Sequence, residues 1–121
     1  MTVGRGDVVL VRFPFSSAAR SKVRPALVVQ SDQNNSRMQN TIVVPITTNT
    51  SRVGEATQLL VDPATPSGQS CGLLAPSAIT CENIATVHQS RITRTIGHLP
   101  DDLMQQVNAC LKASLGIPQH D

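Results

Sequence analysis

The chain has 121 residues, of which 40% are hydrophobic, and its formal net charge is +2 at pH 7. This length is sufficient for one domain with its own core. No apolar run reaches the length of a transmembrane helix, and the net charge is too small for the basic footprint of a strong duplex binder. The only aromatic residues are Phe13 and Phe15, which argues against a protein that binds single strands mainly by base stacking.

The cysteines give no sign of a disulfide framework or a zinc site. Cys71, Cys81 and Cys110 are odd in number and show no CxxC spacing. The first residues lack a signal-peptide pattern. Together these features predict a protein of the reducing cytoplasm without a disulfide framework or a zinc site.

Two segments near the N-terminus have the composition of buried strands. Residues 8–13 are apolar on both faces, which predicts a strand that is covered on both sides. A second strand is expected over residues 24–30. There, Pro25 keeps Arg24 extended, so that a permanent cation stands at the mouth of a rigid strand.

A third strand is expected over residues 41–48 and contains a proline. Pro45 cannot donate to a ladder, and it therefore predicts a bulge or an edge position. Bulges often lie beside active sites, so Thr47 just beyond the proline is a candidate functional residue. The alternative for Thr47 is an ordinary β-branched strand residue.

Polar segments separate these strands. Residues 16–22 form a loop with small residues and two cations, Arg20 and Lys22, which suit an anionic ligand. A solvated hairpin tip is the alternative for this loop. Residues 31–36 are dense in turn-forming residues and are expected to form a loop.

The second half of the chain begins with shorter elements. Residues 62–72 are rich in Pro, Gly, Ser and Thr and are expected to form a long surface connection. A bulge is expected near Glu82 and Asn83, where the apolar alternation breaks. Strands are expected over residues 57–61, 72–77, 78–87 and 90–99.

The apolar period changes from two to that of a helix after Pro100. Aspartates 101 and 102 lie in the first turn, where the helix dipole favours anions, and Gly116 followed by Pro118 ends the pattern. The apolar stripe consists of Leu103, Met104, Val107, Cys110, Leu111 and Leu115. Strands followed by a closing helix predict one α+β domain, a curled antiparallel sheet with the helix against one face.

Six segments, distributed in order over nearly the whole chain, form a recognisable pattern: GDVV at 6–9, RPALVVQ at 24–30, VVPIT at 43–47, CENIATV at 81–87, SRI at 90–92 and IGHL at 96–99. This pattern resembles the MazF/PemK toxins of bacterial toxin–antitoxin modules. The resemblance implies a single domain over residues 1–121 with an SH3-like barrel. Its main sheet would span about 6–87, with a small strand at about 90–99 and a helix at about 100–115.

The resemblance also implies an activity and partners. It implies a homodimer that cleaves single-stranded RNA at selected sequences without a metal or other cofactor, and that a cognate antitoxin holds in check. An acidic, amphipathic antitoxin segment would lie in a groove near the basic loop that carries Arg20 and Lys22.

The expected chemistry can be assigned to residues. Metal-free RNA cleavage requires a base for the 2′-OH, an acid for the leaving oxygen, and donors for the charge on the phosphoryl group. The family's Arg–Thr pair matches Arg24 and Thr47. Arg24 can grip two phosphate oxygens but is a poor base at neutral pH. Asp7 and Glu82 match positions where relatives carry acids and are candidates for the base, with a turn cap or a solvated charge as the alternative for each.

The sequence departs from the family pattern in two places. The loop over residues 16–22 has no His or Glu, and Ala85 and His88 stand where many relatives carry Arg and Asp. His88 is a candidate RNA contact, although a surface histidine without a role is the alternative. The complete set of expected RNA contacts is Arg20, Lys22, Thr48 and His88.

Two other functions are compatible with these residues. A gyrase-poisoning module of the CcdB kind would share the fold, because fold alone does not fix function. A phosphate-gripping pair such as Arg24 and Thr47 would have no use there. An attenuated homologue that only binds RNA or antitoxin is the second alternative, and Ala85 is the residue that favours it.

Overall fold

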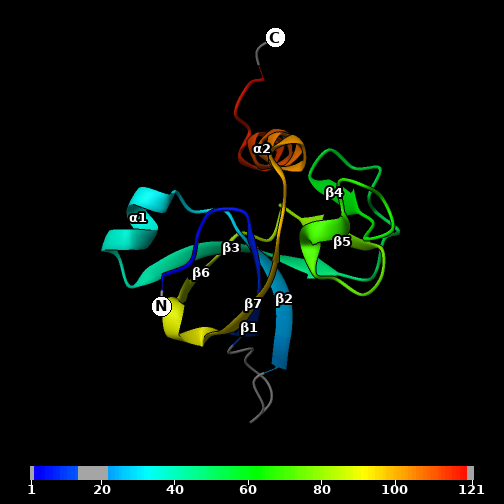
Figure 1. Ribbon diagram of the computed structural model, residues 1–121. Helices are drawn as coiled ribbons and strands as arrows, with labels where there is room; N and C mark the ends of the chain where they lie inside the picture. The colour runs from blue at the N-terminus through cyan, green and yellow to red at the C-terminus, as the bar shows by residue number, and fades with distance from the viewer. Residues whose placement is uncertain (1, 14–21, 120–121) are drawn as a thin grey trace.

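The structure is a computed structural model that describes residues 2–13 and 22–119 (Figure 1). Strands make up most of the described chain, and one long helix closes it. The elements in chain order are β1 (Asp7–Phe13), β2 (Lys22–Val28), α1 (Asp32–Arg37), β3 (Asn40–Thr47), β4 (Gln58–Val61), η1 (Gln69–Cys71), β5 (Ser77–Thr80), β6 (Ala85–His88), η2 (Gln89–Arg91), β7 (Ile92–His98) and α2 (Asp101–Leu115).

The strands form one curled antiparallel sheet, with α2 packed across it (Figure 1). Within the described residues the strand order is β4-β5-β3-β2-β1-β7, and β6 pairs with β3 beside β5. All the pairings are antiparallel. The α+β class predicted from the order of strands and helix is confirmed.

The alternation of side chains along the central strands creates two apolar layers. Val8 on β1 belongs to the layer beneath α2, whereas Val9 and Val11 belong to the layer on the opposite face. All three side chains are fully buried. This is the two-sided coverage that the apolar run predicts, and it makes β1 a rigid axis through the sheet.

Helix α2 begins and ends close to the predicted positions. Its first turn carries Asp101 and Asp102, and its C-cap Gly116 has a φ of 70°. In that left-handed conformation the Gly116 N–H donates to the Ala113 carbonyl, which satisfies a group that the helix end would leave free. Within residues 2–13 and 22–119, no helix is long and apolar enough to cross a membrane.

Helix α1 occupies the segment over 31–36 that was expected to be a loop. The Ser31 side chain accepts a hydrogen bond from the Asn34 N–H at 3.2 Å and caps the helix. Buried Asn35 exchanges hydrogen bonds with Gln30, its Oδ1 accepting from the Gln30 amide at 2.9 Å, and it also accepts from the Thr41 hydroxyl. These tertiary hydrogen bonds stabilise a polar segment as a helix. The local sequence pattern does not predict them.

Two strand predictions differ from the structure. The strand expected over 78–87 is divided into β5 and β6 by a turn at residues 81–84, which replaces the expected bulge. The segment over 72–76 is not a strand. It is the loop that leads from η1 to β5, and it is called the wall segment because it forms one side of the pocket described below. In both places a turn lets the chain change its pairing partner.

The wall segment over residues 72–76 is held against β7 by backbone contact. A Cβ atom on Gly97 would collide with the backbone of Cys71 and lie 2.5 Å from the Ser70 carbonyl oxygen. A Cβ on Gly72 would collide with the carbonyl of Ile96, and Gly72 also has a φ of 75°. Two glycines are therefore required for the loop and the strand to touch.

We expect Gly97→Ala to lower the free energy of unfolding by roughly 2–3 kcal/mol, because the backbone of the loop or of β7 must shift. Gly54→Ala is the control, since a Cβ at Gly54 meets nothing within 4 Å. Urea unfolding of both variants measures the difference. Equal stability of the two would contradict the proposed backbone contact.

Candidate functional site

A pocket of about 830 Å³ opens at one end of the sheet. It lies where β1, β2, β3 and β7 come together, and the wall segment closes its side. Its lining consists of Leu10, Phe13, Arg24, Pro25, Pro45, Ile46, Thr47, Thr48, Gly72, Leu73, Leu74, Ala75, Ser77, Arg94 and Ile96.

Two prolines explain why the pocket opens at this point. Strands β2 and β3 pair from Val28 with Val43 to Ala26 with Pro45, which is the last pair. Two residues further along the same register, Arg24 would face Thr47. Pro25 and Pro45 have no N–H for the ladder, so they favour the separation of the strands here. The pocket lies between the separated ends, with Arg24 and Thr47 in its lining.

Thr47 is prepared to donate a hydrogen bond. Its Oγ1 accepts from the Asn49 N–H at 3.1 Å, which leaves the hydroxyl hydrogen for another partner. Thr48, predicted as an RNA contact, also lines the pocket and is exposed. Both threonines thus line the same pocket as Arg24, whose side chain is also exposed.

The charged residues in the described lining are both arginines, Arg24 and Arg94. Neither forms a recorded ion pair with a carboxylate of residues 2–13 or 22–119. The pocket therefore presents two uncompensated positive charges over an apolar floor. Such a site favours an anion that also carries apolar surface.

Sequence reasoning missed Arg94. It lies on β7 opposite Leu10 of β1, and this register alone places it at the pocket. A single sequence gives no register between segments so far apart. Nothing in the local pattern distinguishes Arg94 from Arg91, an exposed arginine that is not among the pocket residues.

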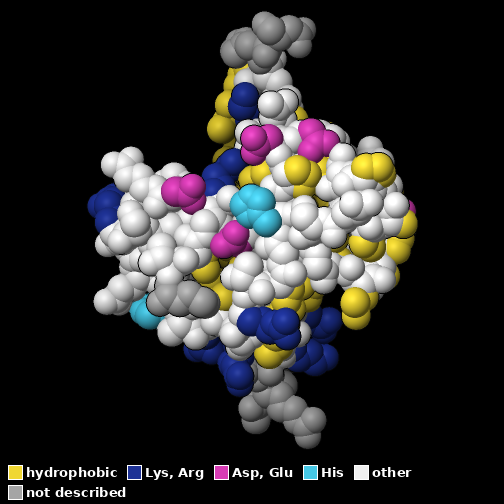
Figure 2. Space-filling model, viewed as in Figure 1, with side chains coloured by type: hydrophobic (Ala, Val, Ile, Leu, Met, Phe, Trp, Pro, Cys, Tyr) yellow, Lys and Arg dark blue, Asp and Glu magenta, His cyan; other side chains and the backbone are white. Residues whose placement is uncertain are grey.

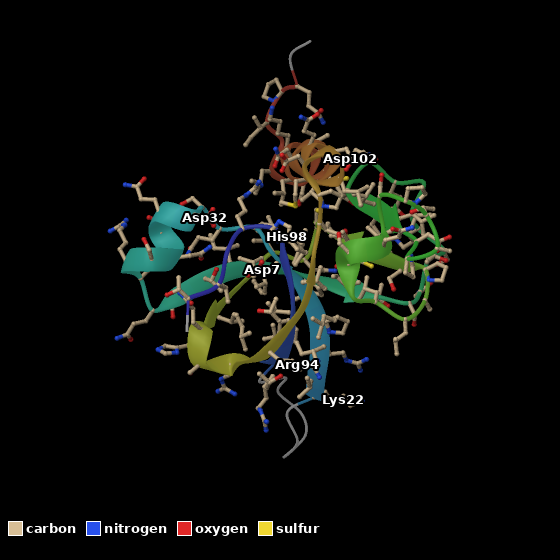
Figure 3. All side chains as sticks on the ribbon, viewed as in Figure 1. Asp7, Lys22, Asp32, Arg94, His98 and Asp102 are labelled. Atoms are coloured by element: carbon tan, nitrogen blue, oxygen red, sulfur yellow. The ribbon has the colours of Figure 1, made fainter. Side chains whose placement is uncertain are left out.

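Asp7 lies at the opposite end of β1 from the pocket. Its carboxylate accepts from the Gly4 N–H at 2.8 Å and contacts Nδ1 of His98 at 3.0 Å. Figure 3 shows Asp7 and His98 together near the centre of the view, whereas Arg94 and Lys22 lie at the lower end. These contacts give Asp7 a role in fixing the first turn, and the structure does not bring it to Arg24.

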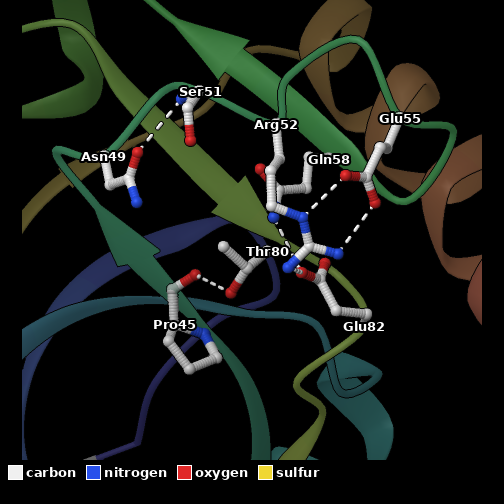
Figure 4. A network of polar contacts seen from close by, with 8 residues as sticks. All are labelled: Pro45, Asn49, Ser51, Arg52, Glu55, Gln58, Thr80 and Glu82. Carbon is white, nitrogen blue, oxygen red and sulfur yellow. Dashed lines mark hydrogen bonds and ion pairs between the residues drawn. The ribbon is translucent and has the colours of Figure 1, made fainter.

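Glu82 belongs to a separate polar network (Figure 4). Its Oε2 accepts from the Gln58 amide at 2.7 Å and lies 3.9 Å from a terminal nitrogen of Arg52. Arg52 itself pairs with Glu55 at 2.6 Å, and this hydrogen bond lowers the pKa of Glu55. Glu82 is therefore held by neighbours and is not among the pocket residues.

The other predicted contacts are distributed over different places. Lys22 begins β2 and pairs with Phe13, so its exposed side chain lies near the pocket mouth. His88 is exposed and contacts the Gln39 side-chain oxygen at 3.2 Å, in a second hollow of about 450 Å³. Arg20 lies outside the described residues.

The cysteines offer no nucleophile to the site. All three are free and buried. Burial raises the pKa of the Cys81 thiol to about 12, so this group stays protonated at neutral pH. In the described part of the chain, no group of three His, Cys, Asp or Glu side chains could hold a metal ion.

Comparisons with known proteins agree on one family. Residues 4–115 match a family model described as PemK-like, MazF-like toxin of type II toxin–antitoxin system. The endoribonuclease EndoA of Bacillus subtilis is 32% identical over 118 residues, which cover 97% of each chain.

Solved structures share the fold. A mycobacterial endoribonuclease in complex with its cognate antitoxin has a TM-score of 0.77 at 20% identity, covering 98% of this chain and 99% of that one. The Mycobacterium tuberculosis toxin MazF-mt6 has a TM-score of 0.75 at 23% identity, covering 93% and 99%.

We expect Asp7→Ala to lower the free energy of unfolding by about 1–2 kcal/mol, because the Gly4 N–H and His98 lose their acceptor. Asp101→Ala, at the exposed start of α2, serves as a control and should cost about 0.5 kcal/mol from the helix dipole alone. Urea unfolding compares them. A loss at Asp7 no larger than at Asp101 would argue against the structural role.

Proposed function

Because the chain belongs to the PemK-like, MazF-like toxins of type II toxin–antitoxin systems, we propose that it is an endoribonuclease that cleaves single-stranded RNA without a metal ion. The observation that carries the proposal is the pocket itself. Arg24 and Thr47 both line it, beyond the last pair of β2 with β3, and every charge in the described lining is positive. The kinship with the B. subtilis endoribonuclease supports the same reaction.

The reaction suited to these groups is transfer of a phosphoryl group within the RNA. The 2′-oxygen forms a bond to the adjacent phosphorus, the bond from phosphorus to the 5′-oxygen breaks, and a 2′,3′-cyclic phosphate and a 5′-OH result. A proton leaves the 2′-OH and another reaches the 5′-oxygen. Negative charge on the phosphoryl oxygens increases in between.

Arg24 and Thr47 divide the work on that phosphate. The Arg24 guanidinium binds two phosphoryl oxygens and stabilises their growing charge. Thr47 donates its free hydroxyl hydrogen to the same phosphate or orients the 2′-OH. The pocket residues among 2–13 and 22–119 include no carboxylate and no histidine. Charge stabilisation is therefore the contribution that these residues make to catalysis.

The proposed partners follow from the same charge pattern. Figure 2 shows Lys and Arg side chains gathered at the lower end of the molecule, while most acidic side chains in this view lie in the upper half. An acidic antitoxin segment would compete with RNA for the basic end. The solved relatives in complex with antitoxin support such a partner. We include in this proposal a homodimer and, because the substrate is cellular RNA, a cytoplasmic site of action.

We expect Arg24→Ala to lower kcat for RNA cleavage by about 10²- to 10³-fold, because the growing phosphoryl charge loses its main donor. Thr47→Val should also slow cleavage, whereas Thr47→Ser, which keeps the hydroxyl, should retain most activity. The measurement is cleavage of a mixed transcript in EDTA, with mapping of the product ends.

Arg37→Ala, at an exposed arginine of α1 that does not line the pocket, is the matched control and should cleave like the wild type. The products should carry a 2′,3′-cyclic phosphate and a 5′-OH. Full activity in Arg24→Ala, or a wild type that cuts no RNA, would contradict the proposal.

A further inference from the structure

We propose that Arg94 is a second phosphate-binding residue of the pocket, which holds a phosphate next to the scissile one and so sets the path of the RNA strand. This inference rests on the proposed RNA cleavage. It begins from the finding that two cations line the pocket and that the assigned chemistry uses only Arg24.

The position of Arg94 is fixed by the ladder on both sides of β1. Leu10 pairs with Arg94 of β7 on one side and with Pro25 of β2 on the other. Arg24 pairs with the next residue, Val11. The two arginines thus lie on the strands that flank β1 at nearly the same level, and their backbones are two strand spacings, or roughly 10 Å, apart. Because Leu10 and Val11 alternate, the two side chains leave opposite faces of the sheet, and both reach the pocket at its end.

This separation suits two phosphates better than one. Arg24 and Thr47 line the pocket together, and both are assigned to the phosphate that is attacked. Arg94 lies on the other side of the apolar floor formed by Leu10 and Pro25. Its guanidinium is therefore placed to bind a different part of an extended RNA strand. The charge of Arg94 is available, because no carboxylate among the described residues pairs with it.

The cations continue beyond the pocket. Arg12 lies two residues after Leu10 and so on the same side of β1 as Leu10, and Lys22 pairs with Phe13 at the end of the strand. Figure 3 shows Arg94 and Lys22 at the same end of the molecule, with Asp7, Asp32 and Asp102 far from them. An RNA strand that leaves the pocket past Arg94 therefore meets further positive charge, and no carboxylate is among the described residues that line the pocket.

The test uses the full chain and a single-stranded RNA that the wild type is shown to cleave. Affinity is measured by fluorescence anisotropy on the same RNA with a 2′-deoxy substitution at the cut site, which removes the attacking hydroxyl. The titration is repeated over a range of NaCl concentrations, because each phosphate contact adds about 0.7 to the slope of log K against log salt for single strands.

We expect Arg94→Ala to weaken binding roughly tenfold and to reduce the salt slope by about 0.7. KM should rise while kcat changes little, in contrast to Arg24→Ala. Arg94→Lys should keep the slope, because the charge remains. Arg91→Ala removes the same charge from a neighbouring exposed position outside the pocket, and should leave affinity and slope at wild-type values.

The outcomes separate the two proposals. If the wild type cleaves RNA but Arg94→Ala matches Arg91→Ala in affinity and slope, the role of Arg94 is overturned and the cleavage function stands. Weakened binding of an acidic protein partner with RNA binding intact would likewise overturn the assignment to RNA. If the wild type neither binds nor cleaves RNA, both proposals fail.

Discussion

The change of partner along one edge of β3 determines where the site lies. Residues Asn40 to Val43 pair with β6, whereas Ile46 and Thr47 pair with β5. Pro45 stands at the junction. Because proline has no N–H, the change of partner leaves no unpaired backbone donor at this residue. On the other edge the same proline is the last partner of β2. This one residue therefore allows β3 to pair with β6 on one side of it and with β5 on the other, and to separate from β2. The pocket occupies the space between β2 and β3.

Much of this arrangement can be predicted from local sequence. The apolar runs of the central strands, the period of α2 and its glycine cap are short-range signals, and each has a direct physical reading. Pro45-Ile46 lies close to the end of β3, whereas Arg24-Pro25 lies inside β2, which begins at Lys22 and not at Arg24 as expected. The prediction that Pro45 signals a bulge or an edge was wrong in form, because β3 is central and its pairing with β2 runs in register up to Pro45. The proline marks a change of neighbour instead, which a single sequence cannot distinguish from a bulge.

The remaining features depend on contacts between distant segments. From the sequence, Asp7 and Glu82 are both candidates for the base, since each matches a position where relatives carry an acid. Their surroundings differ from the pocket because Asp7 is bound by Gly4 and His98, and Glu82 by Gln58. Arg94 shows the converse: its placement arises only from the register of β7 on β1. Helix α1 was also missed, because its stability comes from the buried amide of Asn35.

Gly72 and Gly97 support the wall of the pocket through backbone contacts, so the residues that support the wall differ from those that can contact a ligand. The wall segment is fastened to β7 through main-chain atoms at Gly72, and Leu73 packs against the apolar layer beneath α2. Leu74 and Ala75 are exposed although they line the pocket. Mutations at Leu74 and Ala75 can therefore alter the shape and polarity of the wall at little cost in stability. A lineage of such proteins could diverge in the sequences that it accepts while the fold and the arginines beneath stay constant.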